Sequence, residues 1–181
     1  MPRWCWGDYD NDGDLDILLT GGDSGNNPVA KIYRNDGGVL VDSGTADDAL
    51  TGVASSSVAW GDYDNDGDLD ILLTGLDSSL NPVAKVYRND GGVLVDSGTA
   101  DDALTGVASS SVAWGDYDND GDLDILLTGR DSGNNHVAKV YRNDSGLFVD
   151  SGPADDALTG VFFGSVAWGD YDNDGDLDIL L

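Results

Sequence analysis

The stretch Gly7-Asp-Tyr-Asp-Asn-Asp-Gly-Asp-Leu-Asp16 decides the fold, because it occurs four times at a constant spacing of 54 residues. Its copies begin at Gly7, Gly61, Gly115 and Gly169. A recurrence at this period is typical of repeat architectures, in which each unit is one supersecondary element that is stabilised by its neighbours. The sequence therefore predicts one repeat domain over residues 1–181, with units at about 1–54, 55–108 and 109–162 and a partial unit at 163–181.

The repeated stretch also places carboxylates at positions 1, 3, 5 and 9 of a loop that has glycine at position 6. Calcium takes six to eight oxygen ligands, and calcium loops supply them from positions 1, 3 and 5, from the carbonyl of position 7 and from a later carboxylate. We assign the aspartate at position 7 as a carbonyl ligand whose side chain points to water. The predicted ligands of four calcium ions, one in each loop, are Asp8, Asp10, Asp12, Asp14 and Asp16; Asp62, Asp64, Asp66, Asp68 and Asp70; Asp116, Asp118, Asp120, Asp122 and Asp124; and Asp170, Asp172, Asp174, Asp176 and Asp178.

Other interpretations of the loop are weaker. An EF-hand needs a glutamate at position 12, where this chain has Leu19, and the apolar run before it indicates a strand. A merely acidic surface turn is the plain alternative, but neighbouring carboxylates repel by roughly 4 kcal/mol per pair at an effective dielectric of about 20. Magnesium demands a stricter octahedron, and the single cysteine and single histidine exclude a zinc cluster.

The composition favours an all-β fold. All 35 acidic residues are aspartate, which serves turns rather than helices, and the chain has 26 glycines. The net charge of −27 makes nucleic acid and anionic membranes poor partners. The hydrophobic content of 40% argues against disorder, and no run approaches the ~20 apolar residues of a membrane span.

The pattern within one unit predicts four short strands that form a propeller blade. In the second unit these strands cover Ser57–Tyr63, Leu69–Gly75, Val83–Asn89 and Val93–Asp96. The first two are apolar and the last two carry charges, as in a blade that runs from the axis outward between two neighbours. A parallel β-helix is the main alternative, but its repeats are shorter. The expected architecture is an all-β β-propeller with three complete four-stranded blades and half of a fourth.

Two stretches together resemble the FG-GAP (VCBS) repeat of integrin α-subunit propellers and bacterial surface proteins. Val58-Ala59-Trp60-Gly61 stands where that family has Phe-Gly, and the acidic string from Asp62 to Asp70 follows it. The resemblance implies a calcium-bearing propeller, commonly seven-bladed, with the metal between the first and second strands. The predicted calcium loops indicate an extracellular or cell-surface location, although no signal peptide is expected after Met1.

Three and a half blades are too few for the usual ring of that family. Either the chain is a fragment, or copies assemble through the open blade ends. We expect a homo-oligomer in which Ser165–Leu181 of one copy pairs with Val29–Asp42 of another, because Gly169–Leu181 repeats Gly7–Leu19 without change.

The differences between units suggest where a partner binds. The first two units differ at four positions, three of them between the second and third strands, and the third unit changes there too, at Arg130 and His136. Drift in permissive loops is the alternative explanation.

An enzyme is not expected, because nearly every polar group recurs in each unit, while His136 and Cys5 occur once without an evident partner. We expect a structural or adhesive scaffold with a protein or glycan ligand on the face opposite the metal loops. The alternative is a lectin-like or carbohydrate-enzyme accessory propeller. The tryptophans argue against this alternative, because they are expected in strand cores rather than at exposed blade edges.

Overall fold

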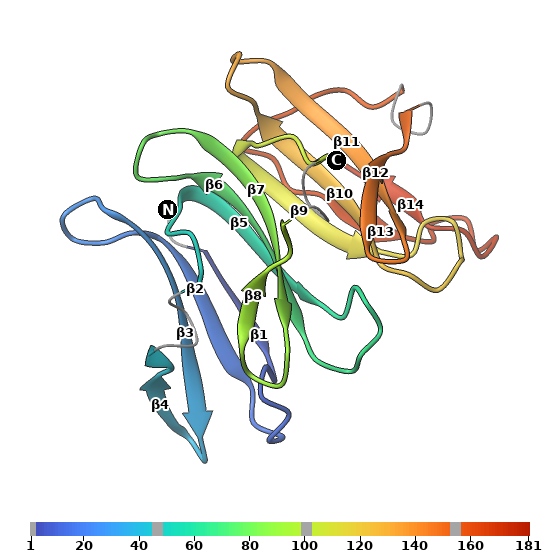
Figure 1. The fold of residues 1–181 in the computed structure, drawn as a ribbon. Helices are drawn as coiled ribbons and strands as arrows, with labels where there is room; N and C mark the ends of the chain where they lie inside the picture. Colours follow the sequence, from blue (N-terminus) through green and yellow to red (C-terminus); the bar gives the residue numbers. More distant parts are fainter. Residues whose placement is uncertain (1–2, 45–48, 99–102, 153–156) are drawn as a thin grey trace.

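The structure is a computed structural model that describes residues 3–44, 49–98, 103–152 and 157–181, and its regular elements there are all β-strands. Three four-stranded antiparallel sheets and one two-stranded sheet follow one another along the chain (Figure 1). Their strands are β1 (Arg3–Gly7), β2 (Asp16–Gly22), β3 (Pro28–Asp36) and β4 (Val39–Asp42); β5 (Ala54–Gly61), β6 (Asp70–Leu76), β7 (Pro82–Asn89) and β8 (Leu94–Asp96); β9 (Ala108–Gly115), β10 (Asp124–Arg130), β11 (His136–Asp144) and β12 (Leu147–Asp150); and β13 (Ala167–Gly169) and β14 (Asp178–Leu180).

The predicted propeller blades are confirmed. Each complete sheet has its strands in sequence order, so it is a simple up-and-down meander of hairpins. The predicted strands of the second unit agree with β5 to β8 within about three residues at each end. The largest difference is at β5, which ends at Gly61 because the chain there enters the acidic loop, and which begins at Ala54 through a bulge before Ser57.

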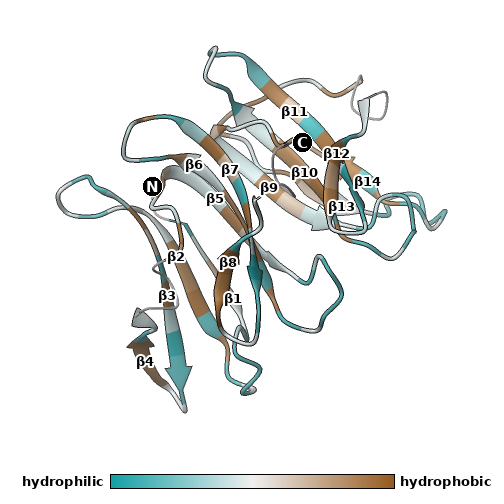
Figure 2. Ribbon diagram, in the orientation of Figure 1, coloured by the Kyte–Doolittle hydropathy of each residue, from teal (hydrophilic) through white to brown (hydrophobic). Residues whose placement is uncertain are grey.

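The sheets stand face to face, with their apolar side chains between them. Figure 2 shows brown, hydrophobic segments within the strands and teal, hydrophilic residues in the turns. One core cluster lies between the first and second sheets, a second between the second and third, and a third between the third sheet and the partial one. Strand β6 of the second sheet, apolar on both faces as predicted, is buried throughout Asp70–Gly75. No helix with the length and hydrophobicity of a membrane span occurs in the described part of the chain.

The first strands of neighbouring sheets lie beside one another. They form the inner side of the arc in which the successive sheets are arranged. The backbone N–H of Val112 in β9 donates to the hydroxyl of Ser57 in β5 at 3.3 Å. The N–H of Val166 donates in the same way to Ser111 at 3.1 Å. Because the same unit recurs, these contacts recur with it, and the sheets fan out around a common axis as blades do.

An aromatic pair joins each unit to the next. The tyrosine of each acidic loop stacks on the tryptophan of the following first strand, with ring centroids 6.3, 6.3 and 6.2 Å apart. The three pairs are Tyr9–Trp60, Tyr63–Trp114 and Tyr117–Trp168. The prediction that tryptophans lie in the core is wrong for Trp4 and Trp6, which are 62% and 54% exposed. They lie on the outer face of the first sheet, where the chain provides no preceding blade.

The tryptophan of each pair requires glycine at the end of the preceding first strand. A Cβ built on Gly61 would lie 2.6 Å from Cδ1 of Trp114. We therefore expect Gly61→Ala to lower the free energy of unfolding by about 1–3 kcal/mol, the usual cost of overpacking. Gly169 is the matched control, because a Cβ there meets no atom within 4 Å among the described residues. Equal denaturant midpoints for Gly61→Ala and Gly169→Ala would contradict the packing argument.

The single cysteine, Cys5, lies on the inward face of β1, on the side opposite to Trp4 and Trp6. Cys5 packs partly buried against the cluster between the first two sheets, and burial raises the pKa of its thiol to about 12. Because the thiolate is the nucleophile, we expect Cys5 to resist a thiol reagent at pH 8 in the folded protein. The thiol should react with one equivalent after unfolding in guanidinium chloride. Rapid stoichiometric reaction of the native protein would show that the site is open.

Candidate metal centres

Each acidic loop connects the first and second strands of its unit, so all four loops lie at the same end of their sheets. Glycine at position 6 adopts a left-handed backbone, with φ of 95° at Gly13 and 96° at Gly67, which turns the chain sharply. The aspartate at position 1 then accepts two backbone hydrogen bonds across the turn. In the first loop, Asp8 accepts from the N–H groups of Asp12 and Gly13 at 3.0 Å each.

The structure brings three carboxylates together in every loop. Oxygens of the three lie within 4.8 Å of one another. Positions 1 and 3 contribute in all four loops, position 9 in three loops and position 5 in one. The four sets are Asp8, Asp10 and Asp16; Asp62, Asp64 and Asp66; Asp116, Asp118 and Asp124; and Asp170, Asp172 and Asp178. The remaining predicted side-chain ligands at position 5 instead cap the loop, as Asp12 does by accepting from the N–H of Asp14 at 2.8 Å.

The aspartate at position 9 is the most buried carboxylate of each complete unit's loop, also in the second loop, where Asp70 is not one of the three gathered carboxylates. Asp70 is 0% exposed, and its two oxygens accept hydrogen bonds from the N–H groups of Tyr63 and Asn89 at 2.9 and 2.8 Å. Burial, which outweighs these two bonds, raises the pKa of Asp70 to about 7 and that of Asp124 to about 6. The carboxylate thus ties its loop to the third strand while its charge remains poorly solvated.

In the first two loops, the aspartate at position 3 carries a buried oxygen for which the described residues provide no hydrogen-bond partner. Oδ1 of Asp10 and Oδ1 of Asp64 are buried, and within the described ranges neither accepts a hydrogen bond. Burial, followed by the charge of Asp12 or Asp66, raises the pKa of each carboxyl. Buried carboxylate oxygens normally have a partner. A hard cation with oxygen ligands fits this donor set, because it would supply that partner and neutralise the repulsion.

The side chain at position 7 does not simply point to water, and this prediction is wrong. Asp68 accepts a hydrogen bond from the side-chain amide of Asn11 in the preceding loop at 2.6 Å and another from the N–H of Gly91 at 2.7 Å. The same link joins Asn65 to Asp122 and Asn119 to Asp176, at 2.9 Å each. The position-7 side chain therefore fastens neighbouring loops together. Its carbonyl remains our predicted ligand.

Two asparagines of the site were missed by the sequence argument. Asn11, at position 4, has a left-handed backbone with φ of 58°, which asparagine tolerates. Asn89, 0% exposed at the end of β7, donates to the carbonyl oxygens of Tyr9 at 2.7 Å and Leu69 at 3.2 Å. Both recur in every complete unit, and that internal repetition was the available signal.

The residues that distinguish the third unit gather at the opposite end of the sheets. His136, for which the sequence suggested no partner, lies with its ring 4.4 Å from that of Phe162. The guanidinium of Arg130 lies over the same ring at 5.9 Å. A groove of about 280 Å³ runs between the loops of the second and third units, lined among others by Leu80, Arg130 and Asp131.

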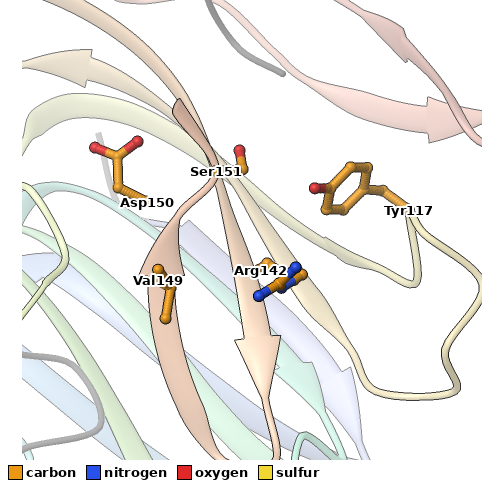
Figure 3. Close-up of a pocket in the computed structure, with 5 residues that line it drawn as sticks. All are labelled: Tyr117, Arg142, Val149, Asp150 and Ser151. Carbon is orange, nitrogen blue, oxygen red and sulfur yellow. The ribbon is translucent and has the colours of Figure 1, made fainter. Parts of the chain in front are cut away.

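A second pocket lies at the outer edge of the third sheet. Figure 3 shows Tyr117 and Arg142 lining it together with Val149, Asp150 and Ser151, and its volume is about 240 Å³. The equivalent tyrosines Tyr9 and Tyr63 are only 5% exposed, because the outer strand of the following blade covers them. The pocket beside Tyr117 lies where that outer strand would stand, since the last described sheet has two strands.

Comparison with known proteins agrees with this architecture. The family model of the FG-GAP-like repeat matches residues 8–73, and the 54-residue unit recurs beyond this stretch. A search of curated proteins gave no match.

Solved structures with a similar fold include a lectin and a rhamnogalacturonan lyase. An Agrocybe aegerita lectin that recognises non-reducing terminal N-acetylglucosamine is 21% identical, with a TM-score of 0.60 over 98% of this chain and 46% of the lectin. A rhamnogalacturonan lyase of Bacillus licheniformis is 16% identical, with a TM-score of 0.55 over 98% of this chain and 39% of the lyase. The chain thus spans less than half the length of either protein, and the likeness establishes the β-propeller-like fold.

Proposed function

We propose that the chain is a calcium-binding β-propeller module that serves as a structural, adhesive scaffold for protein interactions. The observation that carries the proposal is the recurring set of three carboxylates, with oxygens within 4.8 Å, at the same place in all four units. A bound calcium ion would neutralise these carboxylates and fix the loop. The chain itself holds Asp8 through the turn, holds Asp16 through the third strand and keeps one oxygen of Asp10 buried.

The proposal also covers where the protein acts and whether it is a catalyst. Calcium modules outside cells bind with dissociation constants of about 10⁻⁴–10⁻³ M, which suits an extracellular or cell-surface protein. We do not propose catalysis, because the described polar groups recur from unit to unit rather than forming one asymmetric constellation.

Titration calorimetry on the metal-free protein tests calcium binding. We expect about four calcium ions per chain and much weaker binding of magnesium, whose octahedral geometry the loop does not favour. Asp64→Ala should remove one site and leave the other three, because each unit brings its own ligands. The absence of heat with calcium, or a preference for magnesium, would rule the proposal out.

A glycan-binding propeller is the second candidate. It is favoured by the groove between the second and third units and by the side chains unique to the third unit beside it, and a lectin is among the proteins with this fold. Arginine and aromatic rings together suit sugar hydroxyls and ring faces. A glycan array with the wild type and with Arg130→Leu, which installs the residue of the second unit, separates the candidates. Binding that the substitution abolishes would support the glycan ligand.

A further inference from the structure

The side chains that join successive units are exposed at both ends of the arc. Tyr9 and Tyr63, which stack on the tryptophan of the next unit, are each 5% exposed. The last tyrosine of this series, Tyr171, is 83% exposed, and the first tryptophan, Trp6, is 54% exposed. The 181-residue chain therefore presents both halves of a contact that it makes three times internally.

We propose that the partial unit of one molecule docks on the open face of the first sheet of a second molecule, in the geometry that joins successive units within one molecule. Tyr171 of the first molecule stacks on Trp6 of the second, as Tyr9 stacks on Trp60. The proposal goes beyond calcium binding, since it rests on the packing of the blades.

The receiving face is an apolar hollow of about 510 Å³. Its lining consists of Trp4, Trp6, Ile17, Leu19, Tyr33 and Leu40. Leu40 is 51% exposed, whereas its counterparts Leu94 and Phe148 are 5% and 4% exposed. Phe148 is covered by the tyrosine of the preceding loop, with ring centroids 5.5 Å apart. Docking would cover Leu40 with Tyr171 in the same way.

A polar link between loops is available at the same place. Within the molecule Asn119 donates to Asp176 at 2.9 Å, and Asn11 donates to Asp68 at 2.6 Å. Asn173 and Asp14 are the next donor and acceptor of this series, and they lie at opposite ends of the arc. In the docked pair, Asn173 of one molecule donates to Asp14 of the other.

A buried asparagine shows the same incomplete pattern. Asn89 donates to two carbonyl oxygens, one of its own unit and one of Tyr9 in the preceding unit. Asn35, its counterpart in the first sheet, donates at 3.2 Å to the carbonyl of Leu15 in its own unit. The carbonyl of Tyr171 of a second molecule occupies the place of the missing acceptor.

Strand β1 carries a large side chain, Trp4, that suits a neighbouring sheet of only two strands. Val166 packs on Leu126 and Val140 of the preceding sheet. Trp4 stands at the position of Val166 in the first unit. The partial sheet offers Leu180, the counterpart of Leu126 and 71% exposed, but its two described strands include no counterpart of Val140. The larger tryptophan can fill the space that a third strand would take.

Docking also preserves every sheet. The exchange of hairpins expected from the sequence must break the six residue pairs between β2 and β3. It would also expose the apolar residues of the displaced β2, whose burial the hydrophobic effect favours. Docking adds a contact and removes none. The charge of −27 opposes association, so the contact is expected to be strongest with calcium bound.

Sedimentation of the full chain in saturating calcium tests the contact. We expect a mass of at least two chains of 18.9 kDa each at micromolar concentration. Tyr171→Ala should weaken self-association about tenfold or more, since buried aromatic residues dominate interfaces. Leu80→Asn is the matched control, because Leu80 is 74% exposed away from both ends and other units have asparagine there. A monomer that binds four calcium ions would overturn docking and leave the proposed function intact.

Paired substitutions that change charge identify which residue of the second molecule Asn173 contacts. Asn173→Asp sets two carboxylates against each other and should weaken association about tenfold, and Asp14→Asn in the same chain should restore it. If Asp68→Asn restores it instead, the partial unit has replaced the first hairpin of the second molecule, and the docking proposal is wrong. Calcium titration of each variant shows whether a loss of association merely reflects a loss of metal.

Discussion

Chelation of calcium is expected to lower the melting temperature of the protein by about 20 °C or more. A ligand that binds only the native state adds RT ln(1 + [L]/Kd), about 2.7 kcal/mol per site at a hundredfold excess over Kd. Four such sites act on one chain of 181 residues, for which about 1 kcal/mol corresponds to 2–4 °C. Calorimetric scans with calcium and with EGTA measure the shift.

Metal exchange controls this result. Returning calcium should restore the original melting temperature, whereas the same concentration of magnesium should restore little of it. The prediction fails if the melting temperature is unchanged after elemental analysis has shown that the metal has left.

Asp70→Ala is expected to lower the free energy of unfolding by about 2 kcal/mol or more, even without calcium. The fully buried carboxylate accepts from two backbone N–H groups, those of Tyr63 and Asn89, and the substitution would leave both donors unpaired. Each unpaired buried group costs about 1–3 kcal/mol. Relief of the desolvation that raises the pKa of Asp70 offsets part of this cost.

The same position in the partial unit is the matched control. Asp178 accepts from the N–H of Tyr171 at 2.8 Å, in a loop that is exposed. Asp178→Ala should therefore change the stability of the calcium-free protein by less than about 0.5 kcal/mol, as surface substitutions usually do. Urea unfolding curves of both variants in EGTA provide the comparison, and equal losses would show that Asp70 has no special structural role.

The sequence predicted the blades and the loops well because both are local patterns. The turn at Gly67 and the alternation in Asp70–Leu76 depend on residues that are near in sequence, so the hairpin and its gathered carboxylates followed from spacing. Contacts between units depend on how far one sheet is rotated against the next. The link from Asn11 to Asp68 and the exposure of Trp6 therefore became visible only in three dimensions.

The link between neighbouring loops has a consequence for how such a chain can grow. Asn11 and Asp68 occupy positions 4 and 7 of the same repeated string, so every copy carries both a donor for the next copy and an acceptor for the previous one. A duplicated unit therefore fits its neighbours without any new interface. Whole blades can be added or lost by gene duplication or deletion, and selection needs only to adjust the number that closes a ring.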